Sequence, residues 1–179
     1  MPNIRPFEGH FPRVAENVWI DDTALVIGEV AIGRGSSLWP YAVARGDING
    51  ITIGARTNIQ DGSVLHVSHA GPFNPEGAAL VIGDDATVGH RATLHGCTVG
   101  DHCLIGMGAI VLDRAVVEPR VMVGAGALVT PGQVLASGFL YVGQPARRAR
   151  PLTEHEIAYL DYVAAHYVEL AERYRLGGA

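Results

Sequence analysis

VGDHCLIGMGAIVLDRAVV, residues 99–117, places a branched aliphatic residue at every sixth position. A small residue follows each of the first three by four places, as Cys103, Ala109 and Ala115. A helix would repeat its apolar residues every three or four positions, and an ordinary strand every two. A step of six therefore indicates short strands joined by tight turns, with three strands completing one triangular coil.

The same step of six runs through most of the chain. Its apolar positions are Val14, Ile20, Val26, Ile32, Leu38, Ala44, Ile53, Ile59, Leu65, Ile82, Val88, Leu94, Val99, Ile105, Val111, Val117, Val123 and Val129. Stacked coils of this kind bury a continuous aliphatic interior. We therefore predict a mainly β protein with a solenoid from about Val14 to Val134. The pattern resembles the hexapeptide-repeat left-handed parallel β-helix, a triangular prism, and this resemblance supplies the left hand.

The repeat gives way to a helical pattern after residue 150. Apolar residues then recur at steps of three and four: Ile157, Leu160, Ala164, Tyr167, Ala171 and Tyr174. Thr153 and Glu156 have the spacing of a capping box, which marks the helix start. We expect residues 1–150 to form the β-helix domain with a short N-terminal lead-in, and residues 151–179 to form a C-terminal helix. This helix would pack on the prism or on a neighbouring prism; a coiled coil is the weaker alternative, because clear charge pairing is missing.

Composition narrows the function classes. The 179 residues carry a net charge of −5 and no basic block, which argues against nucleic acid and anionic membranes as partners. No apolar stretch is long enough to span a bilayer, and Met1 to His10 lacks an apolar signal core, so we expect a cytoplasmic protein. The two cysteines fit a reducing compartment. Cys103 is expected to be a buried thiol. Cys97, two residues after His95, is a less favoured metal ligand, since three histidines suffice for zinc.

Two histidines fall in one column of the predicted prism. Ala44, Leu65 and Leu94 begin strands on the same face, so Arg45, His66 and His95 share the next, outward position. Successive coils lie about 4.8 Å apart, which brings the two imidazoles within reach of one ion. The 29 residues from Leu65 to Leu94 exceed one coil of about 18 residues. The excess predicts a loop directly after His66, over residues 68–79.

A third histidine belongs to a different face. Leu38, Ile59 and Val88 begin strands on the preceding face, where Pro40, Asp61 and His90 share one position and Gln60 lies beside Asp61. Only five residues, or up to about 16 Å of extended chain, separate His90 from His95. His90 would complete the pair from a second subunit if two prisms met face to face. Repeating this contact must close into a ring, and we expect a homotrimer with metal sites between its subunits.

Three stretches closely resemble the gamma-class carbonic anhydrase-like proteins: Ala44-Arg45-Gly46-Asp47, Asn58 to His66, and Val88 to Cys97. The resemblance covers nearly the whole chain, including Gly143 to Arg147 and the closing helix. It implies that His66, His90 and His95 bind zinc across a trimer interface. It also implies that Arg45 and Asp47 lie in or beside the pocket, that Gln60 contacts metal-bound solvent or bicarbonate, and that Asp61 supports ion pairing between subunits. Tyr159 of the helix would reach the pocket.

The activity implied by this resemblance is the reversible hydration of CO2 to bicarbonate, with Gln60 and Arg45 orienting the substrate. Histidine nitrogens suit Zn²⁺, and also Fe²⁺ or Co²⁺. Arg45 and Asp61 could instead be purely an interface pair. Active members of the class carry a glutamate just after the Arg-x-Asp segment, where this chain has Ile48. Glu76 in the loop offers a carboxylate, and His69 is an ordinary loop residue or a proton carrier. Turnover is therefore expected to be slow, buffer-dependent or absent.

Other functions share this repeat. Hexapeptide solenoids also form acyl- and acetyltransferases with a histidine base, and the segment Gly143 to Arg147 resembles the end of their solenoids. A thioesterase, or a non-catalytic metal-binding scaffold, remains open as well. A fold alone does not fix a function, and the three aligned histidines favour the hydrolytic metal site.

Overall fold

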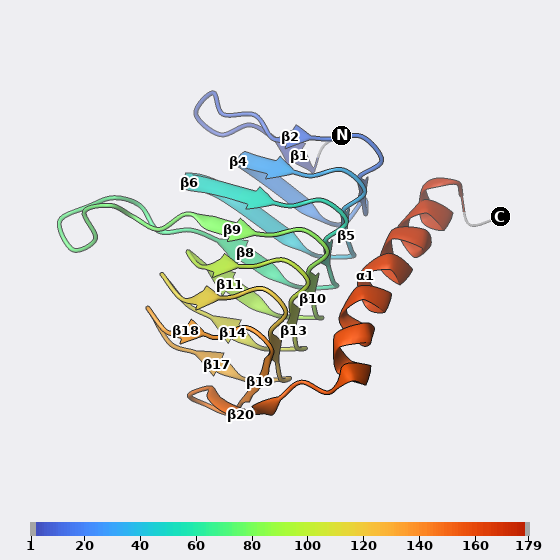
Figure 1. Cartoon of the computed structure of the whole chain (residues 1–179). Coiled ribbons are helices and arrows are strands. Elements are labelled where there is room, and N and C mark those ends of the chain that lie inside the picture. Colours follow the sequence, from blue (N-terminus) through green and yellow to red (C-terminus); the bar gives the residue numbers. More distant parts are fainter. Residues whose placement is uncertain (1–2, 178–179) are drawn as a thin grey trace.

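The computed structural model describes residues 3–177 and confirms the predicted parallel β-solenoid with a C-terminal helix (Figure 1). The short strands inside the solenoid pair in parallel with strands one coil before and after them, as Asn58, Thr87 and Leu104 do. The step of six is thus one strand plus one turn. Residues 1–2 of the predicted lead-in and 178–179 of the predicted helical segment lie outside the described residues.

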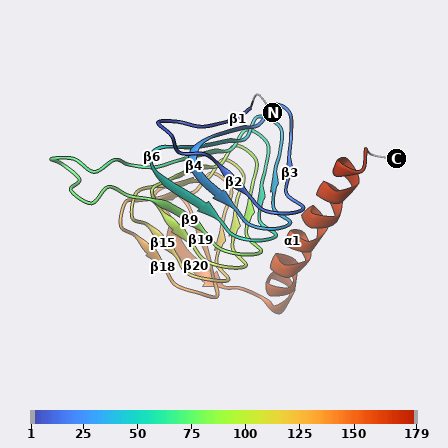
Figure 2. The same cartoon turned by 90° about the horizontal axis from the view of Figure 1, so that it is seen from above.

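Three faces form the prism, and the long strands β4 (Leu25–Ile32) and β6 (Val43–Ile53) each run along two of them (Figure 2). The first face adds β8 (Val64–His66), β11 (Thr93–His95), β14 (Ile110–Val111) and β17 (Leu128–Val129). The second adds β9 (Leu80–Ile82), β12 (Thr98–Val99), β15 (Val116–Val117) and β18 (Val134–Leu135). The third comprises β3 (Trp19–Ile20), β5 (Ser37–Leu38), β7 (Asn58–Ile59), β10 (Thr87–Val88), β13 (Leu104–Ile105), β16 (Met122–Val123), β19 (Phe139–Val142) and the antiparallel β20 (Arg147–Pro151). At the N-terminal end, β1 (Ile4–Arg5) and β2 (Arg13–Val14) pair with β4.

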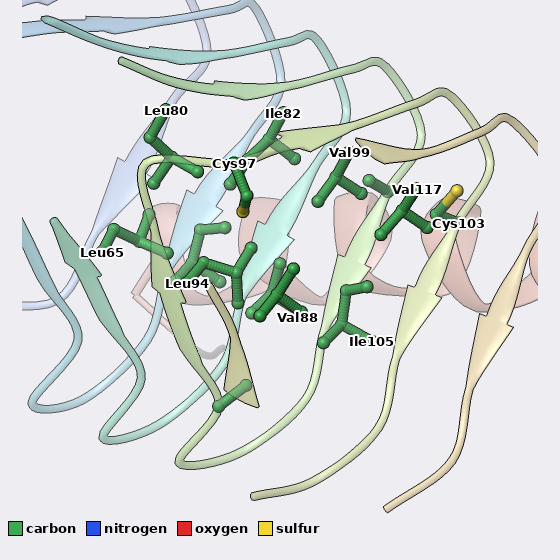
Figure 3. Packing of buried hydrophobic residues seen from close by; sticks show 14 of the residues in the cluster. Leu65, Leu80, Ile82, Val88, Leu94, Cys97, Val99, Cys103, Ile105 and Val117 are labelled. Carbon is green, nitrogen blue, oxygen red and sulfur yellow. The ribbon is translucent and has the colours of Figure 1, made fainter. Parts of the chain in front are cut away.

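The repeated aliphatic positions form the interior of the prism. Leu65, Val88 and Leu94 point into it from neighbouring faces and are fully buried (Figure 3). Cys97 and Cys103 are also buried, and burial raises the pKa of each thiol to about 12. Cys103 is therefore the buried thiol that the sequence predicted. Cys97 faces the core as a neutral thiol, whereas a metal ligand would have to be an exposed thiolate.

Glycine is required where consecutive coils approach most closely. Gly54 follows the buried Ile53, and a Cβ atom at Gly54 would lie 2.4 Å from the backbone carbon of Gly83 in the next coil. This contact is far inside van der Waals distance. The glycine that follows many of the repeated aliphatic residues therefore permits the turn to stack on its neighbour.

The predicted loop leaves the prism directly after His66. It joins β8 to β9 and projects away from the coils (Figures 1 and 2). Antiparallel bridges between Ser68 and Ala78 and between Gly71 and Asn74 hold its two arms together. The Ser68 hydroxyl donates to Asp113 Oδ2 at 2.7 Å, which fixes the loop base to the prism.

Helix α1 (Glu154–Arg175) packs against the third face of its own prism, with contacts to β3, β5, β7 and β10. The predicted capping box is confirmed: the Thr153 hydroxyl accepts from the Glu156 amide at 3.2 Å, and the Thr153 amide donates to Glu156 Oε2 at 2.9 Å. No helix within residues 3–177 has the length and apolar character that crossing a membrane requires.

The buried stripe of α1 differs from the predicted one at its ends. Leu160, Ala164 and Ala171 are buried as expected, but Ile157 and Tyr174 are 37% and 55% exposed. Both residues lie near the ends of the helix. Tyr174 still packs on the third face, because its ring centroid lies 5.0 Å from that of Trp19 and 5.3 Å from that of Trp39. Val163, which the predicted stripe omitted, is buried in the middle of the helix.

Replacing Thr153 by alanine is expected to lower the unfolding free energy by about 1 kcal/mol, because the Glu156 amide loses its acceptor. Thr153→Ser keeps the hydroxyl and serves as the matched control. Urea unfolding followed by circular dichroism measures the difference. Equal stability of the alanine and serine variants would contradict a stabilising cap.

Candidate metal site

His66 and His95 meet on the first face, as the coil count predicted. They are direct partners in the parallel pairing of β8 with β11. His66 Nδ1 lies 3.0 Å from His95 Nε2, and the ring centroids are 5.0 Å apart. The repeat therefore places two imidazole nitrogens of successive coils in direct contact.

A carboxylate lies on the outer side of each ring. Asp47 Oδ1 is 3.1 Å from His66 Nε2, and Asp113 Oδ1 is 2.5 Å from His95 Nδ1. Burial tends to raise the pKa of both carboxyls. Hydrogen bonds from Arg45 and His66 to Asp47, and from His95 and Ser68 to Asp113, outweigh burial and lower both pKa values. Both groups are therefore ionised at neutral pH and can only accept hydrogen bonds.

These acceptors determine which ring nitrogens carry protons. Each outer nitrogen must donate to its carboxylate, so His66 Nδ1 and His95 Nε2 face each other with lone pairs if both rings are neutral. Burial is the largest cause that lowers the pKa of His66, and it outweighs the hydrogen bond to Asp47, which raises that pKa. The lowered pKa favours the neutral form of the His66 ring. Two lone pairs 3.0 Å apart repel each other unless a proton or a metal ion lies between them.

The spacing of the two nitrogens suits a zinc ion. Bonds of about 2.0 to 2.1 Å at a tetrahedral angle separate two nitrogen ligands by about 3.3 Å, so the rings need to open by only a few tenths of an ångström. The carboxylate–histidine pairs are the outer contacts that orient metal-binding imidazoles in other proteins. The residues therefore fit a zinc site, and they fit Fe²⁺ or Co²⁺ on the same grounds.

Asp113 is a site residue that the sequence interpretation missed. It lies in the coil after His95, two residues beyond the end of β14, and its carboxylate contacts both His95 and the loop residue Ser68. The repeat gives its approximate place: Leu94 pairs with Val111, so Asp113 lies one position past the column of His66 and His95.

His90 lies in the turn between β10 and β11, where the third face meets the first. Its Nδ1 is 2.9 Å from Asp61 Oδ2, which leaves Nε2 available as an acceptor when the ring is neutral. Within residues 3–177, no three histidine, cysteine or acidic side chains come together as a metal-binding group. A single chain therefore brings His66 and His95 together but does not add His90. Its contribution from a second subunit stays a prediction.

His90 and Gln60 line a mainly apolar groove of about 440 Å³ between α1 and the third face. We call it the α1 groove; its lining also includes Met107, Met122, Leu140, Tyr159, Val163 and Tyr167. Gln60 is buried, and its Nε2 donates to Asn58 Oδ1 at 3.1 Å, which fixes the orientation of the amide. The predicted site residues Gln60, His90 and Tyr159 thus share one cavity.

Arg45 lies on the other side of the predicted site, beside His66. Its Nη1 donates to Asp47 Oδ2 at 2.5 Å within the chain. The predicted interface residues Arg45 and Asp61 therefore have partners of their own, Asp47 and His90. The side chains of both are nearly half exposed, at 44% and 46%, so their contact across subunits stays a prediction.

Further ionisable residues surround Asp47. A cavity of about 520 Å³ is lined by Glu8, His10, Glu29, Asp47 and His69, together with Ile48. Glu29 was missed in the sequence, although β4 pairs with β6 one coil later and so brings it close to Asp47. Glu76, the carboxylate noted in the loop, is exposed.

Asp113→Asn is expected to weaken zinc binding by about 10- to 100-fold. The variant replaces the charged carboxylate that accepts from His95 Nδ1 with a neutral amide, which no longer holds the ring in one orientation. Competition with a fluorescent chelator measures the affinity. Glu169→Gln, which removes one exposed carboxylate from α1, is the control for the change in net charge. An unchanged zinc affinity in Asp113→Asn would show that this carboxylate does not support the metal.

Comparisons with known proteins agree with this fold and these motifs. The family model described as bacterial transferase hexapeptide (six repeats) matches residues 79–112 and 96–131. The chain is 50% identical to Protein YrdA of Escherichia coli (strain K12), over 96% of this chain and 93% of that protein. It is 41% identical to the carbonic anhydrase of Geobacillus kaustophilus, over 96% and 91% of the two chains.

A plant relative is named as a gamma carbonic anhydrase. The chain is 46% identical to the mitochondrial gamma carbonic anhydrase 2 of Arabidopsis thaliana, over 90% of its own length but only 58% of the plant protein. Among solved structures, a hexapeptide transferase family protein from Anaplasma phagocytophilum superposes with a TM-score of 0.90 at 41% identity, covering 97% of this chain and 99% of that one. The chain therefore belongs to the hexapeptide-repeat family, within the group of proteins similar to the gamma carbonic anhydrases.

Proposed function

We propose that the protein catalyses the reversible hydration of CO2 to bicarbonate at a zinc site shared between the subunits of a homotrimer. The single observation that carries the proposal is the contact between His66 Nδ1 and His95 Nε2, 3.0 Å apart, with a carboxylate on the outer side of each ring. Relatives named carbonic anhydrase over most of the chain support the choice of reaction.

Three histidines would hold the metal in this proposal. His66 and His95 come from one subunit, and His90, oriented by Asp61, comes from the next. Zinc held by three neutral imidazoles keeps its full charge and an open position, which supplies a nucleophilic hydroxide near neutral pH. Asp47 and Asp113 keep the two paired rings in the tautomers that point a lone pair inward.

The remaining predicted site residues would bind and orient the substrate. Gln60 uses its amide nitrogen on Asn58, so its carbonyl oxygen is the atom available to accept from the hydroxyl of bicarbonate. Arg45 presents further N–H donors to a carboxylate-like anion while Asp47 holds it in place. Tyr159, on the opposite wall of the α1 groove, bounds the space on the helix side.

Each hydration releases a proton that has to leave the site. The predicted acidic carrier after Asp47 is replaced by Ile48, but Glu8, Glu29 and His69 line the cavity that also includes Asp47. These groups offer carriers in place of the missing glutamate. Where these groups relay the proton too slowly, added buffer should raise the turnover rate.

Metal removal tests the proposal. Stopped-flow measurement of CO2 hydration on protein with one zinc per subunit is expected to show catalysis above the buffer rate, and dialysis against dipicolinate to abolish it. Added zinc, Fe²⁺ or Co²⁺ should restore the rate. No hydration above background by fully metallated protein would reject the reaction.

Acyl transfer is the second candidate, because the Anaplasma phagocytophilum structure is named as a hexapeptide transferase family protein. A histidine base for acyl transfer needs one imidazole with a free lone pair. The facing arrangement of His66 and His95 is not explained by that role. Protection against thermal unfolding by coenzyme A, with no protection by zinc, would favour acyl transfer.

A further inference from the structure

The loop after His66 carries an aromatic side chain with no cover. Phe73 is fully exposed at the loop tip, between Pro72 and Pro75. The loop base is fixed by the hydrogen bond from Ser68 to Asp113 and the bridge to Ala78. Arg114 also donates to the side chain of Asn74, next to Phe73. A phenylalanine presented to water on an anchored loop leaves a large apolar area for a partner surface to cover.

The α1 groove is the apolar surface that offers such cover. Its wall includes Met107, which is 59% exposed, and Met122 from the next coil. Gly106 and Gly124 lie in the same lining and contribute no side chains. Methionine side chains adapt readily to an inserted aromatic ring. The groove is thus open, apolar and wide enough for a phenyl group.

Phe73 cannot enter the groove of its own chain. The loop projects from one side of the prism, and α1 covers the third face on the opposite side, in both views (Figures 1 and 2). The tip of one copy can therefore meet only the groove of another copy. A contact between two different surfaces of identical chains repeats head to tail, and it makes a ring when the rotation between copies completes a full turn.

A shared metal site would bring the loop of one copy to the α1 groove of the next, so this step rests on the proposed function. His90 lines the α1 groove, and the loop begins directly after His66. Seven residues of extended chain from His66 to Phe73 span up to about 23 Å. The groove extends from His90 to Met122 over two coils, or about 10 Å. The loop is therefore long enough to lay Phe73 in the groove of the subunit that supplies His90.

Charge complementarity favours the same contact. Arg45, on the loop side of the site, is 44% exposed, and Asp61, beside His90, is 46% exposed. The contact that joins His90 to His66 and His95 brings this cation towards this anion. Unlike charges at the rim of an interface favour one orientation of the two copies.

We propose that Phe73 of one subunit inserts into the α1 groove of the next subunit and closes the shared site from outside. The occupant of the groove is thus a second copy of this chain, and the loop is an interface element that positions His66 against the partner's His90. Phe73 is a positioning residue in this arrangement and does not touch the reacting atoms.

Cross-linking between two differently labelled subunits tests the proposal. Phe73→Cys protein and Met107→Cys protein are refolded together and treated with a short bis-maleimide. We expect a heterodimer band on a denaturing gel, with at least about tenfold less product from either variant alone. The native Cys97 and Cys103 are buried and stay unreactive. The matched control replaces Met107→Cys with Val134→Cys, which has the same exposure of 59% but lies in β18 on the second face.

A heterodimer that forms equally well with Val134→Cys, or not at all with Met107→Cys, would overturn the proposal and leave the groove to another ligand. Phe73→Ala should also raise the protein concentration needed for ring assembly by at least about tenfold, while Phe73→Leu keeps it near the wild-type value. Neither readout uses CO2. Specific cross-linking without hydration would reject the proposed reaction alone, and hydration without cross-linking would reject the loop contact alone.

Discussion

His66→Ala and His90→Ala are each expected to lower the CO2 hydration rate at least about 100-fold, because each removes one of three metal ligands. When the two inactive proteins are unfolded, mixed in equal amounts and refolded, activity should return. An intact shared site needs His66 from one subunit and His90 from the next, so random rings restore about a quarter of the sites. Stopped-flow hydration and the zinc content per subunit measure the recovery together.

This mixing experiment separates a shared site from one within a single chain. If each chain formed its own site, every subunit in the mixture would still lack a ligand, and no activity would return. His155→Ala, an exposed histidine of α1, is the control and should keep the wild-type rate. Light scattering that shows a zinc-retaining monomer would also contradict the shared site.

Leu94→Ala is expected to lower the unfolding free energy by about 2 to 5 kcal/mol, since it opens a cavity in a close-packed core. Leu94 is fully buried and stacks between Leu65 and Val111 of the adjacent coils. The next residue along β11 is His95, so the cavity also loosens the strand that carries a metal ligand. Urea unfolding at fixed protein concentration, followed by tryptophan fluorescence, measures the loss.

Leu94→Met nearly conserves the volume and should cost less than about 1.5 kcal/mol. Comparing the two variants separates the cavity from a general intolerance of substitution. A loss below about 1 kcal/mol in Leu94→Ala would show that the coils collapse around the missing side chain. Zinc affinity measured on both variants then reports how far packing at Leu94 holds His95 in place.

Much of the fold could be predicted from periodicity alone. The step of six fixed the strand positions, and the extra residues between Leu65 and Leu94 located the loop, because a solenoid adds one strand at a time in sequence order. The helix start at Thr153 followed from its capping residues. The ends of the buried stripe were less predictable: Ile157 and Tyr174 have suitable spacing but stay partly exposed, Tyr174 even though its ring packs on Trp19.

The candidate site was predictable in part for the same reason. Counting coils aligned His66 with His95 and set His90 apart, as the structure has them. Asp113 and Glu29 reach the site from other coils, and a local motif search passes over them. The regular coil after His95 gives the approximate place of Asp113, whereas Glu29 lies at a register shift between β4 and β6 that the repeat does not reveal.

The sequence by itself determined the order of the coils, the column that joins His66 to His95 and the place of the loop. Each coil contacts only the coil before it and the coil after it, so the number of residues between two positions tells which of them stack. Only the tertiary structure decided which side chain faces which. It placed carboxylates outside both imidazoles and brought their inner nitrogens together, and it packed α1 over the third face to leave a groove beside His90. Hydrogen-bond direction and side-chain packing depend on contacts between distant coils, which residue spacing does not encode.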